Sequence, residues 1–240
     1  MRAINDYSDK RHKGWCIHCG HELATGESSR DHVPTKSLLR LSPPANLPVV
    51  DVCAECNNLY SLDEEYFTVF LETVLVGSTD AEFAHNPSIA RALKRNSKLK
   101  ALIDGSKTEY EDASGEKKII WHPEQERISR VVLKNARGHA YYEFGEPIFD
   151  EPEYVRAMPA INLTTEQLAE FENSEDGFGG WPEIGSRMMQ RLMTGEDIQD
   201  GWIIVQDGIY RYSVLSSANG VRVRSVIFEY LLTDVCWSNS

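Results

Sequence analysis

The spacing of apolar residues along the chain predicts three helices. In residues 57–77, apolar side chains recur every three or four positions and a glycine ends the run, which is typical of a helix with a terminator. The segment 86–105 has a similar pattern, and Pro87 stands where a first helical turn accepts proline. A third helix is predicted from about residue 124, and we expect it to end near Gly138.

Turn residues between apolar runs predict strands in much of the remaining chain. We expect a hairpin around Ser114-Gly115, and a strand meander over residues 197–237 with turns at Asp207-Gly208 and Asn219-Gly220. The glycine-rich residues 173–186 are predicted to form a mobile loop. These elements together indicate the α+β class.

Composition and charge narrow the classes of function. The 240-residue chain has no apolar run that could serve as a signal peptide or span a bilayer, so we expect a cytoplasmic protein without a membrane partner. Its net charge of −12 argues against a passive nucleic-acid coat, although bound metal ions or a local basic patch can still attract phosphate. The polar face of the predicted second helix is either a solvated surface or such a patch. Its basic residues are Arg91, Lys94, Arg95, Lys98 and Lys100.

Four of the five cysteines form two Cys-x-x-Cys pairs, which favours a metal site over disulfides in a cytosolic protein. These are Cys16, Cys19, Cys53 and Cys56, and together they can complete a tetrahedral zinc site. Gly20 suits the positive φ that such a turn often needs. Two incidental thiol pairs or a redox pair are the alternatives, and the redox reading lacks the expected βαβ context. His18 and His21 are expected at the surface, and Cys236 as a buried small hydrophobe.

A hydrolytic site is indicated between the two cysteine pairs. Asp31 and His32 are adjacent and precede Pro34, so a bend there could let the carboxylate hold a divalent ion while the imidazole reaches a water. Asn57 follows Cys56 and offers an amide oxygen suited to Mg²⁺. Alone, His32 reads as a structural histidine and Asn57 as a helix N-cap.

The segments "CIHCG", "DHVP" and "ANLPVVDVCAECNN" together resemble the HNH endonuclease family, whose fold is the ββα-metal finger. The resemblance implies that His32 is the general base, and that Asp31 and Asn57 coordinate a catalytic Mg²⁺ or Mn²⁺. It further implies that Asn46 braces the loop and orients His32, and that the four cysteines hold a structural zinc. The chain departs from the family at Asn57, where a histidine is common.

This resemblance also implies a domain organisation and a function. An N-terminal ββα-metal zinc module would span residues 1–78, and an α+β accessory region of unassigned role would span residues 79–240. The protein would be a metal-dependent endonuclease acting on DNA, with RNA left open, in a setting such as phage defence or restriction. A second copy of the chain or a regulatory protein is left open as a partner. The alternative is a non-catalytic zinc module that binds nucleic acid or a protein.

Overall fold

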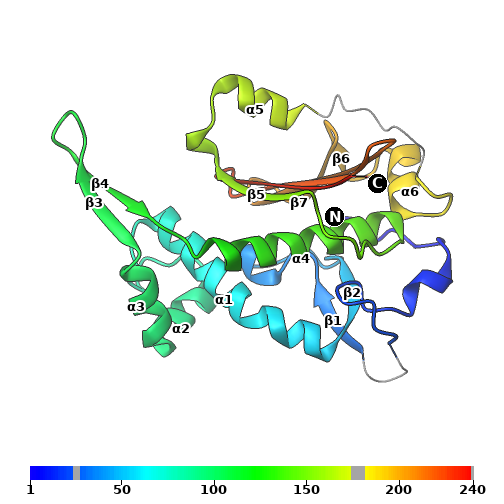
Figure 1. Ribbon diagram of the computed structural model, residues 1–240, viewed down its shortest axis with the longest axis horizontal. Helices are drawn as coiled ribbons and strands as arrows, with labels where there is room; N and C mark the ends of the chain where they lie inside the picture. The colour runs from blue at the N-terminus through cyan, green and yellow to red at the C-terminus, as the bar shows by residue number, and fades with distance from the viewer. Residues whose placement is uncertain (24–27, 174–181, 239–240) are drawn as a thin grey trace. The chain divides into compact units, whose positions relative to one another are not determined.

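The computed structural model describes residues 1–23, 28–173 and 182–238 (Figure 1). Its mixture of helices and antiparallel sheets agrees with the expected α+β class. The chain divides into two compact units: unit 1 combines Met1–Leu59 with Val132–Ser240, and unit 2 is Tyr60–Val131. This division differs from the boundary expected after residue 78, because the chain leaves unit 1 and later returns to it.

Unit 1 begins with two strands followed directly by a helix. Strands β1 (Ser28–His32) and β2 (Val49–Cys53) pair antiparallel, with Ser28 opposite Cys53 and His32 opposite Val49. Helix α1 (Ala54–Val76) starts at the residue after β2, so Cys53 and the first turn of α1 are held next to each other. This confirms the first predicted helix, which begins three residues earlier than expected.

The larger sheet of unit 1 has six antiparallel strands in the order β5-β10-β9-β8-β7-β6. The last five of these in the sequence form the predicted meander. The bounds are β5 (Tyr154–Pro159), β6 (Ile198–Gln199), β7 (Trp202–Gln206), β8 (Tyr210–Ser217), β9 (Gly220–Ile227) and β10 (Leu231–Ser238). The turn at Asp207-Gly208 is confirmed, whereas the β8–β9 turn lies at Ala218-Asn219, one residue earlier than expected. Of the loop predicted over residues 173–186, residues 174–181 lie outside the described residues.

Helices cover both faces of this sheet (Figure 1). Helix α5 (Thr165–Glu172) lies over one face, where Phe171 packs in an apolar cluster with Trp202, Val226 and Leu232. The C-terminal part of α4 (Gln125–Phe144) lies against the other face, where the His139 ring stacks on Tyr212. Helix α6 (Arg187–Thr194) joins α4 through a buried polar network.

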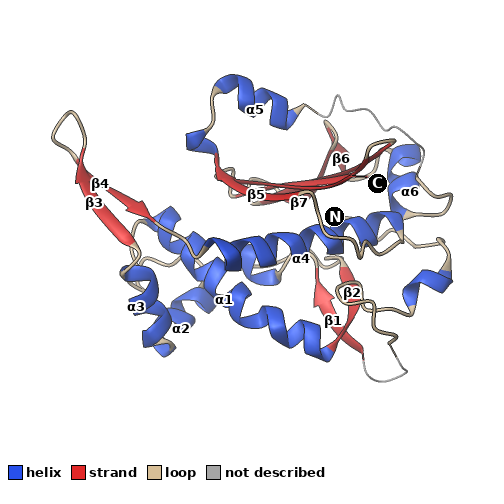
Figure 2. Ribbon diagram, viewed as in Figure 1, coloured by secondary structure: helices blue, strands red, loops and turns tan. Residues whose placement is uncertain are grey.

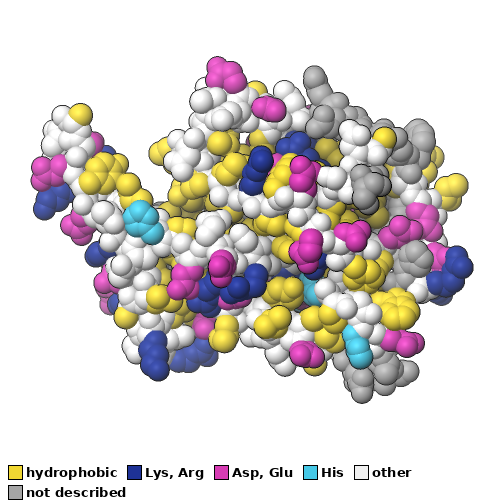
Figure 3. All heavy atoms as spheres, in the orientation of Figure 1, with side chains coloured by type: hydrophobic (Ala, Val, Ile, Leu, Met, Phe, Trp, Pro, Cys, Tyr) yellow, Lys and Arg dark blue, Asp and Glu magenta, His cyan; other side chains and the backbone are white. Residues whose placement is uncertain are grey.

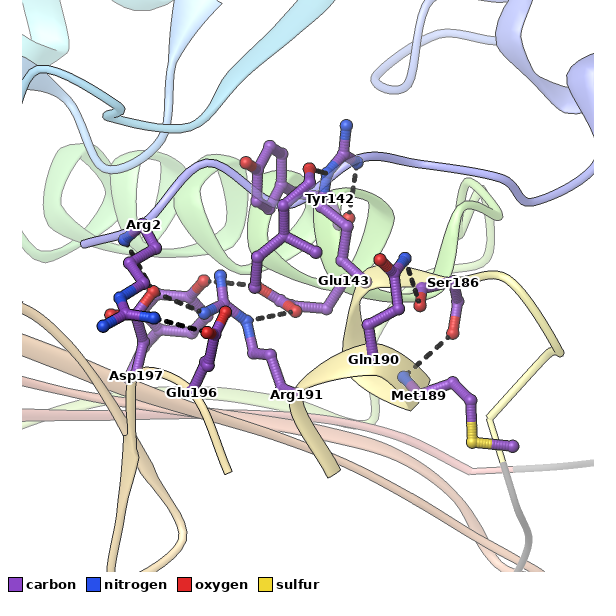
Figure 4. A network of polar contacts seen from close by, with 12 residues as sticks. Arg2, Tyr142, Glu143, Ser186, Met189, Gln190, Arg191, Glu196 and Asp197 are labelled. Carbon is purple, nitrogen blue, oxygen red and sulfur yellow. Dashed lines mark hydrogen bonds and ion pairs between the residues drawn. The ribbon is translucent and has the colours of Figure 1, made fainter. Parts of the chain in front are cut away.

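That network is built around one fully buried ion pair (Figure 4). Arg191 of α6 donates to Glu143 of α4 over 3.0 Å, and both side chains are 0% exposed. The Tyr212 hydroxyl donates to the same carboxylate over 2.6 Å, and Arg191 also donates to Asp197 over 3.1 Å. The backbone N–H of Arg2 donates to Asp197 over 2.8 Å, which ties the start of the chain to this network. Because each buried charge has several partners, the network fixes α6 relative to α4 and the sheet.

Helix α4 continues through Gly138, so the expectation that it ends there is wrong. A Cβ atom at this position would lie 2.6 Å from Cγ2 of Val33, in the segment that follows β1. Gly138 is therefore a place of close approach rather than a terminator, and it lets α4 pack directly on the Asp31–Val33 segment.

Replacing Gly138 by alanine is expected to lower the free energy of unfolding by about 1–3 kcal/mol, the usual cost of overpacking a close contact. Alanine's better helix propensity, worth about 1 kcal/mol, acts in the opposite direction. Urea denaturation measures the net effect. The double variant Gly138→Ala/Val33→Ala should cost less than the sum of the two single changes, because removing the valine methyl groups relieves the clash. Strict additivity would contradict this account of Gly138.

Unit 2 contains the remainder of α1, helices α2 (Pro87–Arg95) and α3 (Ser97–Asp104), and the start of α4. The single helix predicted over residues 86–105 is two helices, because the side chain of Asn96 accepts a hydrogen bond from the Leu99 N–H and begins a new helix. The predicted hairpin is confirmed as β3 (Lys107–Glu111) and β4 (Lys117–Trp121), joined by a turn in which Gly115 has a φ of 80° (Figure 2).

No helix among the described residues is both long enough and apolar enough to cross a bilayer.

Candidate metal and hydrolytic site

Four cysteine sulfurs from separate parts of the sequence meet in unit 1. Cys16 and Cys19 come from the N-terminal segment, Cys53 ends β2, and Cys56 lies in the first turn of α1; their Sγ atoms all lie within 4.8 Å of one another. Cys19 Sγ and Cys53 Sγ are 3.8 Å apart. Ligands 2.3 Å from a tetrahedral zinc would be about 3.8 Å apart, so the cluster could hold a metal ion such as zinc.

Backbone hydrogen bonds shape both halves of this four-cysteine cluster. The Gly20 N–H donates to the Cys16 carbonyl over 2.9 Å, and Gly20 has the expected positive φ, 69°. In the second half, the Cys56 N–H donates to Cys53 Sγ over 3.4 Å. Both turns therefore present their sulfurs to a common point without help from a disulfide.

The electrostatics of the cluster favour a cation. Burial raises the pKa of the Cys56 thiol, and the neighbouring sulfurs of Cys53 and Cys19 raise it further. At Cys16 burial acts in the same direction, but hydrogen bonds from the backbone N–H groups of Cys53, His18 and Cys19 outweigh it and lower the pKa. The Cys16 thiolate is thus stabilised by the backbone, whereas ionisation of Cys19 and Cys56, whose pKa values are raised, is favoured by positive charge nearby.

Asp31 is held by a lysine that the sequence did not suggest. Lys134 Nζ of α4 lies 2.8 Å from both carboxylate oxygens, and the two side chains are 2% and 9% exposed. His18, from the first cysteine turn, places Nε2 4.0 Å from Asp31 Oδ2 and is only 2% exposed in its side chain, so its expected surface position is wrong. Burial raises the pKa of Asp31, but the neighbouring His18 and Lys134 outweigh it and hold the pKa below its ordinary value.

His32 lies on the other face of β1 from Asp31, as adjacent residues of a strand do. Its ring makes no hydrogen bond within the described part of the chain, and the residue is half-buried. Burial and the nearby positive charge of Lys36 lower the pKa of His32 below its ordinary value. The ring is therefore neutral at pH 7, the form that accepts a proton.

Asn57 reaches β1 from the first turn of α1. Its Nδ2 donates to Ser29 Oγ over 2.8 Å, and Ser29 stands two residues before Asp31, on the same face of the strand. Two residues of a strand span about 6.6 Å, so Ser29, which Asn57 contacts, and Asp31 are neighbours on one face of β1. Asn57 Oδ1 makes no hydrogen bond to the described residues and is available as a ligand.

Asn46 makes no hydrogen bond to His32 in the described structure. Its side chain is exposed, and its hydrogen bond goes from Nδ2 to the backbone carbonyl of Met1 over 3.5 Å. The bracing role implied for Asn46 has no contact that supports it. The residues that brace the segment after β1 come instead from α4: Asn135 Oδ1 accepts from the Thr35 N–H over 3.2 Å, and Gly138 packs on Val33.

The oxygen ligands of this site fit a divalent cation, provided that the cation can displace Lys134 from Asp31. Asp31 and Asn57 supply hard oxygen donors of the kind that Mg²⁺ and Mn²⁺ take. Asp31 is the one carboxylate in this set, however, and Lys134 already neutralises it. A divalent ion at Asp31 would therefore compete with the ammonium group of Lys134.

The structure was also compared with known proteins. No protein-family model, no characterised protein and no solved structure matches this chain.

Proposed function

We propose that this protein is a metal-dependent endonuclease of the HNH type that hydrolyses phosphodiester bonds in DNA, with a structural zinc in its four-cysteine cluster. One observation carries the proposal. Two antiparallel strands lead into a helix, Asp31 and His32 end the first strand, and Asn57 lies in the first turn of the helix directly after the last cysteine of the cluster. A module that only binds a partner has no need of this set of side chains.

The residues of the site divide the reaction between them. His32, neutral and without a hydrogen-bond partner among the described residues, accepts a proton from a water molecule as the water oxygen attacks phosphorus; the bond from phosphorus to the 3′ oxygen breaks, and the leaving oxygen takes a proton from solvent. Arg30 and Lys36 are exposed cations near His32 and attract the negatively charged backbone of the substrate. Asp31 and Asn57 would hold Mg²⁺ or Mn²⁺, which would supply Lewis-acid stabilisation of the charge that develops on the phosphate. Lys134, which lies on α4, keeps the carboxylate of Asp31 in place.

The ion pair between Asp31 and Lys134 favours a second candidate function. If Lys134 keeps Asp31 neutralised under all conditions, no catalytic metal binds and the cysteine cluster serves a non-catalytic module that binds nucleic acid or a protein partner. The His32 ring would then have no chemical role. The two candidates differ in one measurable property, cleavage.

Cleavage of supercoiled plasmid by the zinc-loaded protein tests the proposal. We expect nicking that requires Mg²⁺ or Mn²⁺, and a rate about a hundred-fold or more lower in His32→Ala, because a general base contributes at least this factor. His122→Ala, which removes an exposed histidine from unit 2, is the matched control and should cleave like the wild type. Absence of cleavage by folded, zinc-containing wild type with either metal, on plasmid and on single-stranded DNA, would reject the nuclease in favour of the binding module.

A further inference from the structure

Helices α2 and α3 of unit 2 carry the most basic stretch of an otherwise acidic chain. Residues 83–103 contain five lysines and arginines and no aspartate or glutamate, while the whole chain has a net charge of −12. The five basic residues are Arg91, Lys94, Arg95, Lys98 and Lys100, and we call them the basic face. Figure 3 shows Lys and Arg side chains gathered at the lower left, over α2 and α3.

The basic face points to solvent because the opposite side of both helices is apolar and buried. Ile89, Leu93, Leu99 and Ile103 are each no more than 7% exposed. Four of the five cations are exposed and Lys100 is half-buried. These four apolar side chains are thus packed within unit 2, and apart from Leu102, which is 42% exposed, the large side chains that α2 and α3 expose are charged.

Three members of the basic face lack an internal counter-ion. The side chains of Lys94, Lys98 and Lys100 make no hydrogen bond or ion pair to the residues that the structure describes. Arg95 pairs with Glu65 over 3.0 Å, and Arg91 bonds only to the first turn of its own helix. Elsewhere buried or half-buried lysines are paired, as Lys134 is with Asp31.

Like charges face each other within α2. Arg91 and Arg95 are four residues apart in this helix, a spacing at which like charges repel, whereas Lys94 and Lys98 lie in separate helices on either side of Asn96. No acidic residue within either helix before Asp104 relieves this repulsion. Asp80, Glu82 and Asp104 line a hollow together with Lys94 and Lys100, and they mark the edge of the basic face. An external anion with regularly repeated charges would remove the repulsion.

We infer that the basic face binds the phosphodiester backbone of a nucleic acid, independently of base sequence. A backbone presents a row of phosphates that lysine and arginine contact without reading bases. A lipid surface fits less well, because an interfacial helix inserts an exposed apolar face, and Leu102 is the one large apolar side chain that α2 and α3 expose. This surface lies in unit 2, whereas the candidate site lies in unit 1, so it gives the nuclease a second, separate contact with its substrate.

The test is a binding experiment on the full-length protein in the His32→Ala background, without added Mg²⁺ or Mn²⁺, so that cleavage cannot interfere. Fluorescence anisotropy measures binding to a labelled 30-base-pair DNA duplex, a 30-nucleotide DNA strand and an RNA strand of equal length, each over a range of salt concentrations. The triple variant Lys94→Gln/Lys98→Gln/Lys100→Gln removes three exposed or half-exposed charges. The control variant Lys107→Gln/Lys117→Gln/Lys118→Gln removes three charges from the hairpin of the same unit.

We expect the basic-face variant to bind at least ten-fold more weakly at about 0.1 M salt, and its slope of log affinity against log salt to be flatter by about 3, roughly one unit for each lost phosphate contact. The control variant should change affinity less than two-fold. Equal loss in both variants would overturn the inference, because net charge alone would explain it. Unchanged binding in the basic-face variant would do the same, as would binding of wild type to phosphatidylserine vesicles but to none of the three nucleic acids.

The nucleic-acid surface and the proposed nuclease can each be rejected without rejecting the other. Wild type that binds through the basic face but never cleaves plasmid would retain the nucleic-acid surface and reject the nuclease. If wild type cleaves plasmid and the basic-face variant binds nucleic acid normally, the nuclease is retained and this surface is rejected.

Discussion

Removing the metal from the four-cysteine cluster is expected to unfold the region around β1 and β2. Structural zinc contributes about 10–16 kcal/mol to the folding of small zinc modules at neutral pH. A typical domain is stable by about 5–15 kcal/mol in total. The cluster connects the N-terminal segment, the end of β2 and the start of α1, so its loss releases three parts of unit 1 at once. Cys56→Ser should therefore lower zinc content below one ion per chain and abolish the cooperative thermal transition of unit 1.

Cys236→Ser is the matched control for this prediction. Cys236 lies on β10, outside the cluster, and is half-buried rather than buried as its sequence suggests. Its replacement should leave zinc content unchanged and alter the free energy of unfolding by less than about 1.5 kcal/mol, as for most mild substitutions. Metal analysis by mass spectrometry and thermal unfolding by circular dichroism measure both variants. Purified wild type without bound metal, and as stable as Cys56→Ser, would contradict the structural role of the cluster.

The cysteine cluster was predictable from sequence because its signal is local. Two ligands on one tight turn need a fixed spacing, and the four cysteines show it twice. The same holds for the hairpins, whose turn residues directly specify the chain reversal. The proximity of Asn57 to the first strand could also be predicted from the sequence, because the cluster fixes the start of α1 next to the end of β2.

The partners of Asp31 could not be predicted from a local sequence signal. Lys134 is 103 residues away in the sequence, and nothing near Asp31 indicates which helix will cover it. A weaker signal was present in α4, where the small residues Ala136, Gly138 and Ala140 alternate with polar ones. That pattern suits a helix packed closely on two sides, and here one side faces the sheet through His139 and the other faces Val33.

The unit boundary was also hidden from the sequence. Both passages between the units fall inside helices, at Leu59 and Tyr60 in α1 and at Val131 and Val132 in α4. A helix that crosses a boundary keeps its apolar periodicity, and no proline, glycine or polar linker marks the position. The loss of periodicity after residue 77 therefore indicated the end of a helix and not the end of a unit.

Lys134→Met is expected to lower the free energy of unfolding by about 3–5 kcal/mol, because it leaves the buried Asp31 carboxylate without its partner. The double variant Asp31→Asn/Lys134→Met should recover part of this loss, since it leaves no buried charge unpaired. Lys36→Met, which removes an exposed lysine near the site, should change stability by less than about 0.5 kcal/mol and serves as the control. Urea denaturation of the four proteins measures these differences.

Repeating the denaturation with Mn²⁺ asks whether Asp31 is a metal ligand. Without the competing ammonium group, Mn²⁺ should bind Lys134→Met more tightly than wild type and stabilise it by about 2.7 kcal/mol at a concentration a hundred times its dissociation constant. The double variant lacks the carboxylate and should gain nothing. If Mn²⁺ stabilises wild type, Lys134→Met and the double variant equally, the ion binds elsewhere, and Asp31 serves only to anchor α4. If the stabilisation follows the carboxylate, Lys134 sets the metal concentration at which the site becomes competent for hydrolysis.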